Sequence, residues 1–264
     1  MDRTRKPDWL KIKLEAGGNY PKVKKVVEMN KLHTICSSGK CPNIGKCWNM
    51  GTATFMILGD ICTRSCKFCA TKTGKPLPPE PQEPERIADS VHLMQLKHCV
   101  ITSVDRDDLP DKGAQFWADT IMAIRKKKPE TIIEVLTPDF DGVEQYLNIV
   151  FNAKPDIFSH NIETVKRLSS QVRSRAKYEL SLDVLRQSAA KGLITKSGIM
   201  VGLGETEEEV LPEGYYKAIV NEEGADIFGS IEEGAEAIGH LEAGRLQPCP
   251  FQHRDQFHLG CRIA

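Results

Sequence analysis

"GTATFMILGDICTRSCKFC", residues 51–69, joins a short apolar run to three closely spaced cysteines. The apolar part, 51–58, contains Thr and Ile and is bounded by glycines, which predicts a buried β-strand. Cys62, Cys66 and Cys69 follow on the next loop in a C-x3-C-x2-C pattern. Thiolates this close can converge on one inorganic cluster. Three of them leave one iron of a 4Fe–4S cluster without a protein thiolate, and that iron can bind a small molecule.

Downstream of the cysteines, helical and strand-like segments alternate. Residues 74–85 contain five prolines and are predicted to be an extended surface connection without regular structure. Helices are then predicted at 86–97, 115–128, 142–153 and 178–192, and strands at 98–104, 131–136, 156–160 and 194–203. This alternation indicates an α/β fold with a parallel sheet, whose chemistry is expected at the carboxyl ends of the strands.

A second cysteine group precedes the first strand. The segment "CSSGKCPNIGKC" places Cys36, Cys41 and Cys47 in a C-x4-C-x5-C pattern, and a cluster held there would need a fourth ligand from elsewhere. Zinc sites usually combine C-x2-C pairs into four Cys or His ligands, which disfavours a zinc module. Cys99 lies inside an apolar run and is expected to be a small buried hydrophobe.

The charge balance excludes some partners. The 264 residues carry 36 basic and 36 acidic side chains, so neither a nucleic acid nor a membrane surface is indicated. Residues 1–25 hold eight Lys and Arg against three Asp and Glu, which favours a solvated arm over a docking site. No apolar run reaches the ~18 residues of a membrane span. No signal core is visible, so the predicted localisation is cytoplasmic, where disulfides rarely persist.

The cysteine patterns resemble those of known enzymes. C-x3-C-x-F-C after a first strand resembles the radical S-adenosylmethionine enzymes, and the upstream C-x4-C-x5-C makes the chain similar to the lipoyl synthases. The resemblance covers about residues 5–211. It is carried by "RKPDWLKIKL", "LHTICSSGKCPNIGKCW", "TATFMILGDICTRSCKFC", "HCVITSVDRDDLPDKGA", "HNIETVKRL" and "TKSGIMVGLGETEEEV". It implies a partial (β/α)6-type parallel barrel with a cysteine-bearing N-terminal arm.

The resemblance also implies two 4Fe–4S clusters and S-adenosyl-L-methionine as cofactors. The Cys62, Cys66 and Cys69 cluster would cleave S-adenosylmethionine to methionine and a 5′-deoxyadenosyl radical. That radical would remove hydrogen from carbons 6 and 8 of an octanoyl group on a carrier protein or domain. A second, auxiliary cluster on Cys36, Cys41 and Cys47 would be consumed as the sulfur source. An electron donor such as ferredoxin or flavodoxin is the further implied partner.

Four other residues are candidates for contact with the cofactor. Phe68, before the last cysteine of the loop, could pack against a flat ligand. Ser103 begins the segment "SVDRDD", 103–108, at the carboxyl end of a predicted strand, and could touch the methionine moiety. By resemblance, Asn161 and Glu163 could hold the ribose or the amino group. The alternative is that Ser, Asn and Glu at such positions cap the following helices.

The C-terminal part departs from the resemblance. The family's "RSSY" segment, whose first serine supplies the fourth ligand of the auxiliary cluster, is not found, and the one serine after Thr206 is Ser230. Thr206 and Glu209 form a capping box, and Pro212 is expected to end that helix early. The segment 224–230 could be a further strand. We therefore divide the chain into an arm at 1–50 that carries the auxiliary cluster motif, a barrel core at 51–211 and a divergent segment at 212–264. An incomplete barrel end there would leave an exposed sheet edge.

Substitute ligands and alternative functions stay open at this point. Stand-ins for the missing serine ligand include water and the side chains of Cys249, His253, His258 and Cys261. Those four residues are also spaced as an irregular zinc pattern. The leading hypothesis is a lipoyl synthase. The alternatives are an iron–sulfur protein of the same fold that is inactive in sulfur insertion, a zinc module and a biotin-synthase-like enzyme.

Overall fold

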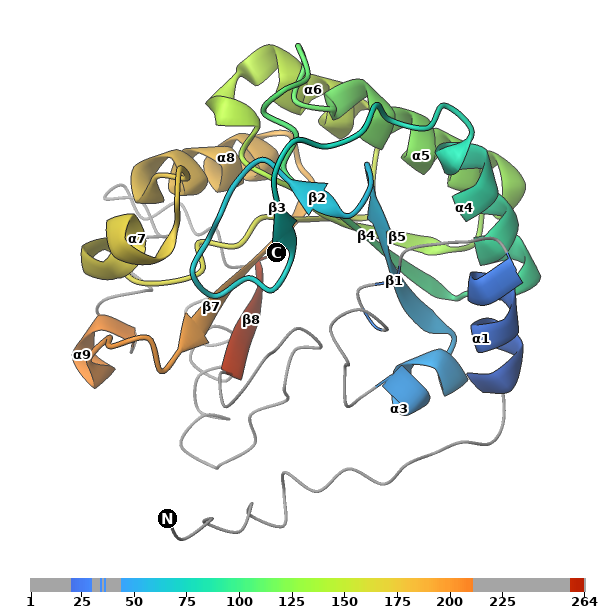
Figure 1. Ribbon diagram of the computed structural model, residues 1–264, viewed down its shortest axis with the longest axis horizontal. Coiled ribbons are helices and arrows are strands. Elements are labelled where there is room, and N and C mark those ends of the chain that lie inside the picture. Colours follow the sequence, from blue (N-terminus) through green and yellow to red (C-terminus); the bar gives the residue numbers. More distant parts are fainter. Residues whose placement is uncertain (1–19, 30–33, 35, 37–43, 211–256, 264) are drawn as a thin grey trace, which may run out of the picture.

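The computed structural model describes residues 20–29, 34, 36, 44–210 and 257–263 (Figure 1). The segment 224–230, Pro212 and Ser230 lie outside the described residues. The division into arm, core and divergent segment therefore stays a prediction.

One six-stranded sheet organises the described part, with the strand order β1-β4-β5-β6-β7-β8. The first five strands are parallel, and each lies where the sequence predicts it. The strands are β1 (Thr52–Ile57), β4 (His98–Ser103), β5 (Ile132–Leu136), β6 (Ile157–Ser159), β7 (Ile194–Val201) and β8 (Phe257–Ile263). A separate pair, β2 (Ile61–Cys62) and β3 (Lys72–Thr73), lies within the cysteine loop. The predicted α/β class with a partial parallel barrel is confirmed.

The last strand differs in direction from the others. β8 pairs antiparallel with β7 along seven residues, from Val201↔Phe257 to Thr195↔Ile263. An antiparallel strand satisfies the N–H and C=O groups of an edge strand as well as a parallel one does. The exposed edge expected of an incomplete barrel end is therefore not found at β7, which is paired with β8.

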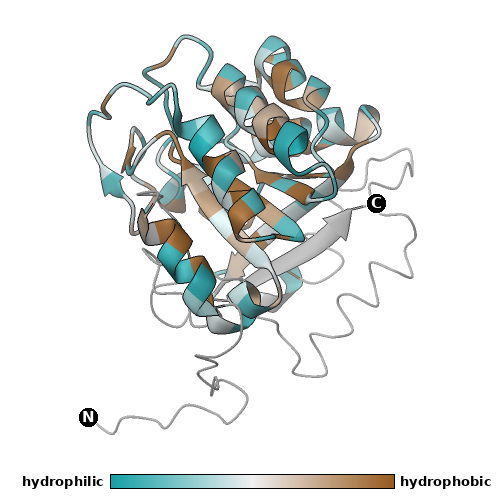
Figure 2. Ribbon diagram, turned by 90° about the vertical axis from the view of Figure 1, so that its right-hand side faces the viewer, coloured by the Kyte–Doolittle hydropathy of each residue, from teal (hydrophilic) through white to brown (hydrophobic). Residues whose placement is uncertain are grey.

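Helices cover the outer face of the sheet (Figure 1). The predicted helices correspond to α4 (Glu83–Leu93), α5 (Ala114–Lys127), α6 (Glu144–Asn152) and α8 (Tyr178–Ala190). The sequence did not predict α1 (Tyr20–Met29), α3 (Ile44–Asn49), α7 (Lys166–Val172) and the 3-10 turn η2 (Phe140–Gly142). Figure 2 shows largely apolar strands behind helices of mixed hydropathy, as expected where helices bury one face.

Two helix ends test the local sequence rules. The expectation that 74–85 holds no regular structure is wrong at its end, because α4 begins at Glu83 with Pro84 in its first turn. Proline is tolerated there, since the first N–H groups of a helix have no intrahelical partner. The capping box that opens α9 (Glu207–Val210) is confirmed: Thr206 Oγ1 accepts from the N–H of Glu209, and Glu209 Oε2 accepts from the N–H of Thr206.

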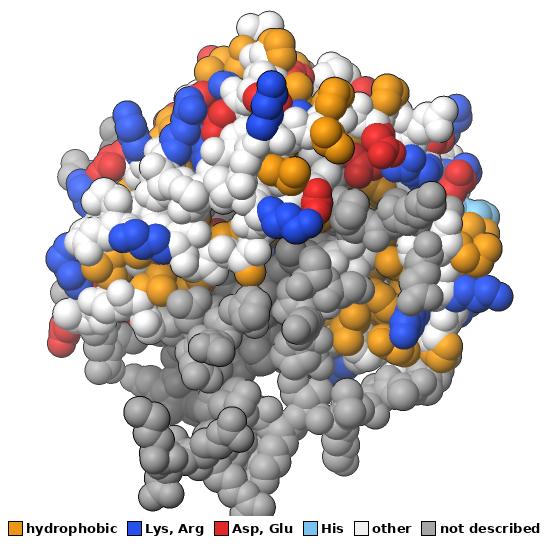
Figure 3. Space-filling model, in the orientation of Figure 1, with side chains coloured by type: hydrophobic (Ala, Val, Ile, Leu, Met, Phe, Trp, Pro, Cys, Tyr) orange, Lys and Arg blue, Asp and Glu red, His pale blue; other side chains and the backbone are white. Residues whose placement is uncertain are grey.

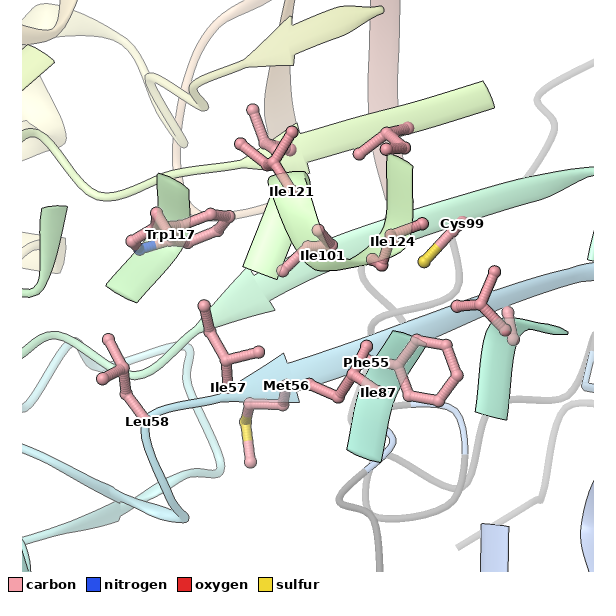
Figure 4. Close-up of a cluster of buried hydrophobic side chains, with 14 of the residues drawn as sticks. Phe55, Met56, Ile57, Leu58, Ile87, Cys99, Ile101, Trp117, Ile121 and Ile124 are labelled. Carbon is pink, nitrogen blue, oxygen red and sulfur yellow. The ribbon is translucent and has the colours of Figure 1, made fainter. Parts of the chain in front are cut away.

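The core lies between the sheet and helices α4 and α5 (Figure 4). Ile101 of β4 packs there with Trp117 and Ile121 of α5, and all three are fully buried. Cys99 is also fully buried in this cluster, as predicted, and burial raises the pKa of its thiol. Burying one such isoleucine stabilises the fold by ~1.5–3 kcal/mol. This packing holds the first two parallel strands in place.

Outside the core, basic and acidic side chains are interspersed over the described part of the face in Figure 3. No helix in the described ranges has both the length and the apolar character needed to cross a bilayer.

We expect Ile101→Ala to lower the free energy of unfolding by ~2–5 kcal/mol, because it removes buried methyl groups and leaves a cavity. Urea unfolding of the full chain measures this change. Met122→Ala on α5 is the control, since Met122 is 50% exposed and its loss should cost no more than ~0.5 kcal/mol. Equal effects of the two substitutions would contradict the assigned core.

Candidate functional site

The candidate site lies where four parallel strands end. The cysteine loop, 59–73, follows β1, and the loop 104–108 follows β4. The segments 137–141 and 160–165 follow β5 and β6. Because parallel strands all end at the same edge, these four loops meet there, as the sequence predicts for the chemistry of such a sheet.

The thiols of the cysteine loop receive hydrogen bonds from the backbone. The N–H groups of Arg64 and Asp105 each donate to Cys62 Sγ at 3.3 Å, and the N–H of Thr71 donates to Cys69 Sγ at 3.5 Å. Cys66 Sγ lies 3.8 Å from the hydroxyl of Ser174. Hydrogen bonds to sulfur are among the means by which proteins tune iron–sulfur clusters.

Burial raises the pKa of the Cys62 thiol to about 11, and the charges of Asp105 and Cys69 add to the shift. The metal-free thiol is therefore protonated at neutral pH, and a bound metal must displace its proton.

The three cysteines fit an iron–sulfur cluster by their donor chemistry. They present three soft sulfur ligands on one loop, with N–H donors directed at two of them. Within the described ranges, no three Cys, His, Asp or Glu side chains converge closely enough to hold a single metal ion. In a cubane cluster each thiolate binds a different iron, so its sulfurs are spread more widely than ligands of one ion.

The upstream cysteine group is described in part. Cys36 is buried and Cys47 is half-buried, whereas Cys41 lies outside the described residues. Burial raises the pKa of both thiols, and the charge of Cys36 adds to the rise at Cys47. Cys36 also interacts with Thr54 of β1. Cys36 thus lies beside the first strand, and the ligand set itself stays a prediction.

Ser103 is the last residue of β4, and its hydroxyl oxygen is buried without a hydrogen-bond partner in the part of the chain that the structure describes. Buried polar atoms normally have a partner, and a bound ligand is one way to supply it. Its place at the site therefore fits the predicted contact with a cofactor.

Glu163 and Asn161 lie together in the loop after β6. Burial raises the pKa of Glu163 to about 7, although Arg173 and Asn161 both favour its charged form. Its backbone adopts a left-handed φ of 65°, a strained conformation that is common at ligand sites. The side chain of Asn161 lies over Gly198, where an added Cβ would come within 2.7 Å of Asn161 Oδ1. A glycine in β7 thus makes room for the Asn161 amide.

Phe68 is half-buried and packs against an apolar cluster that includes Ile162, Leu168 and Val172. This contact with the protein anchors the cysteine loop on α7. The predicted contact of the ring with a flat ligand stays a prediction.

Sequence reasoning missed Arg64, which lies between the first two cysteines of the loop. Its side chain is buried and forms two fork-like ion pairs, with Asp107 at 2.9 and 2.9 Å and with Asp139 at 2.9 and 2.8 Å. Asp105 and Asp141 add longer ion pairs at 3.3 and 3.6 Å. A basic residue inside the cysteine motif, followed one strand later by "DRDD", is the sequence signal that could have revealed this contact.

A buried histidine supports the same edge of the sheet. His160 Nδ1 lies 2.9 Å from the carbonyl oxygen of Thr137, and its Nε2 lies 2.9 Å from the hydroxyl of Ser181. Arg173 donates to the same hydroxyl at 2.8 Å. Burial lowers the pKa of His160 to about 4, and the charge of Arg173 acts in the same direction. The neutral ring therefore joins β6 to the loop after β5 and to α8.

Comparison with known proteins assigns the chain to a family. The model of the Radical SAM superfamily matches residues 56–212. A lipoyl synthase of Parabacteroides distasonis is 61% identical over 207 residues, which are 78% of this chain and 74% of that protein. The chain belongs to the lipoyl synthase family. A mitochondrial lipoyl synthase of Nematostella vectensis is 56% identical over 210 residues, 79% of this chain and 72% of that protein.

The solved structure of methylornithine synthase shares the fold, with a TM-score of 0.50 and 11% identity over 75% of this chain and 60% of that chain. Membership of the family makes the chain a sulfurtransferase, and it implies S-adenosylmethionine and 4Fe–4S clusters as cofactors. The zinc-module and biotin-synthase-like alternatives are set aside by this assignment.

We expect His160 to make stability fall as the pH falls from 6.5 to 4. The unfolded chain binds a proton at His160 in this range while the folded chain does not, so the stabilisation is present above pH 6.5 and is lost on acidification. The predicted loss over this window is ~3 kcal/mol. It is measured by urea unfolding at several pH values, comparing the unsubstituted chain with His160→Gln.

The effect of Glu163, whose pKa of about 7 acts in the opposite sense, is common to both proteins and cancels in that difference. The same pH dependence in both proteins would contradict a neutral buried His160.

Proposed function

We propose that this chain inserts two sulfur atoms, at carbons 6 and 8 of an octanoyl group carried by a protein, to form a lipoyl group. The observation that carries the proposal is the identity of 61% with a lipoyl synthase over 78% of this chain. The three thiols on one loop at the carboxyl edge of the sheet agree with it.

Cys62, Cys66 and Cys69 would hold the cluster of the radical chemistry. With S-adenosylmethionine bound, this cofactor pair supplies a radical able to take hydrogen from unactivated carbons, which no side-chain base could do. The chain's own residues would hold the loop in place and keep water from the reacting atoms. The backbone N–H groups of Arg64 and Asp105 would stabilise the Cys62 thiolate as a ligand.

The residues around the loop would position S-adenosylmethionine. The buried hydroxyl of Ser103 would contact its methionine part, and Glu163 and Asn161 would bind the ribose or the amino group. Burial raises the pKa of Glu163 to about 7, so a cationic amino group beside it would favour its charged form. Phe68 would lie at the border of this site, packed against α7.

Cys36, Cys41 and Cys47 would hold a second 4Fe–4S cluster, which is a substrate because its sulfides are consumed. Its fourth ligand is open, since the serine expected from the family pattern is not found in this sequence. The alternative, a protein of the same fold that is inactive in sulfur insertion, rests on that difference. Partners of the active enzyme would be an octanoylated carrier protein or domain and an electron donor such as ferredoxin or flavodoxin.

We expect Cys66→Ala to abolish reductive cleavage of S-adenosylmethionine, because one ligand of the first cluster is lost. Cys41→Ala should leave this cleavage measurable but stop formation of the lipoyl group. The measurements are 5′-deoxyadenosine release and dihydrolipoyl product from an octanoylated carrier. Lipoyl product from Cys41→Ala would show that the two cysteine groups do not divide the work in this way.

Cys99→Ala is the matched control, since Cys99 is a buried cysteine in the core and should support both reactions. Iron and sulfide counts on anaerobically reconstituted protein then separate the active enzyme from the inactive alternative. About eight irons per chain are expected for two clusters, and about four if one cluster forms.

A further inference from the structure

We propose that Arg64 is a positioning residue that forms the cysteine loop into its cluster-binding shape before any cluster is present. The inference rests on the proposed function only in taking Cys62, Cys66 and Cys69 as cluster ligands. The proposal is based on one observation. The buried guanidinium of Arg64, a residue of the cysteine motif, lies between the loops that follow β4 and β5.

The geometry of Arg64 restricts the loop strongly. Its Nε and Nη2 donate to the two oxygens of Asp107, and its Nη1 and Nη2 donate to the two oxygens of Asp139. Two fork-like pairs fix the plane of the guanidinium as well as its position. Arg64 is 7% exposed, so these ion pairs are little weakened by water. Lysine could not make both pairs, because its ammonium group has no fork.

Backbone contacts hold the rest of the loop around this point. The N–H of Thr63 donates to the carbonyl of Asp105 at 3.1 Å, and the N–H of Lys67 donates to the carbonyl of Val172 at 2.9 Å. The N–H of Ser65 donates to the hydroxyl of Ser174 at 3.0 Å. The loop is thus attached to the strand edge on one side and to the end of α7 on the other, with Arg64 between them. A loop ordered in advance loses less conformational entropy when it binds its ligand.

The charges around Arg64 give it a second effect. Four carboxylates, of Asp105, Asp107, Asp139 and Asp141, lie within 3.6 Å of its nitrogens. Lys112 and Arg175 pair with Asp141 at 3.3 and 3.2 Å. Removing the guanidinium would leave buried carboxylates beside Cys62 without their main counter-charge. Added negative charge near a cluster disfavours the reduced form and lowers its reduction potential.

The first experiment uses the metal-free full chain. Amide hydrogen exchange, followed by mass spectrometry, should show protection of residues 63–74 in the unsubstituted chain. Arg64→Gln should lose this protection at least tenfold while the core peptides from α5 stay protected. Arg64→Lys keeps the positive charge but cannot form two-point hydrogen bonds, so residues 63–74 should lose protection in this variant too.

The control is Arg106→Gln. Arg106 is 2% exposed and pairs with Asp108 through two hydrogen bonds and with the carbonyl of Leu58, so it is an equally buried arginine outside the cysteine motif. Unchanged exchange of 63–74 in both Arg64 variants would overturn the proposal. An equal loss of protection of residues 63–74 in Arg106→Gln would also overturn the proposal, because the exchange of the loop would then reflect only the general stability of the protein.

The second experiment measures the cluster itself in a full chain carrying Cys36→Ala and Cys47→Ala, which leaves one intact cysteine group. Reconstituted Arg64→Gln should hold less iron and have a more negative reduction potential than the same chain with Arg106→Gln. An unchanged potential with full iron would overturn the inference. If Arg64-dependent protection is found but no variant, including the unsubstituted chain, binds iron and sulfide, the inference about the loop stands and the proposed function fails.

Discussion

The contact between the Arg64 guanidinium and the carboxylates of Asp107 and Asp139 joins three loops that are far apart in sequence. Each loop starts where a parallel strand ends, and the in-register pairing of β1 with β4 and of β4 with β5 brings those ends together. A buried guanidinium is stable only when its donors are paired, so these loops are constrained relative to one another. The loop that carries the three cysteines is one of them.

The sequence predicted the elements whose signals are local. The apolar strand before Cys62, the helices α5 and α8 and the capping box at Thr206 all follow from periodicity and capping chemistry. The sequence analysis placed the start of α4 too late. The proline-rich composition of the preceding segment indicated an irregular structure, although Pro84 is acceptable in the first turn of a helix. It missed α7, a seven-residue helix with too few turns to show a clear period.

The candidate site was predicted to a similar extent. The cysteines and Ser103 are visible because their spacing and their position after a strand carry the signal. The partners of Arg64 were not, because Asp107 and Asp139 are 43 and 75 residues away and only the tertiary structure brings them to it. The direction of β8 was not predictable either, since a pairing partner for β7 depends on long-range hydrogen bonds rather than on composition.

Two glutamates of the sheet and its edge differ in how far their charge is compensated by neighbouring groups. Glu134 of β5 accepts from Lys196 at 2.8 Å and lies 3.2 Å from His98, and these partners outweigh burial and lower its pKa to about 2. Glu163, after β6, is half-buried, and burial of its carboxyl group outweighs the effects of Arg173 and Asn161 and raises its pKa to about 7. A carboxylate that is already paired with cations of the protein interacts only weakly with a ligand. A carboxyl group whose pKa is near 7 becomes charged when a cation is placed beside it. The first glutamate ties three strands together within the sheet, and the second lies at the edge where the cysteine loop also lies.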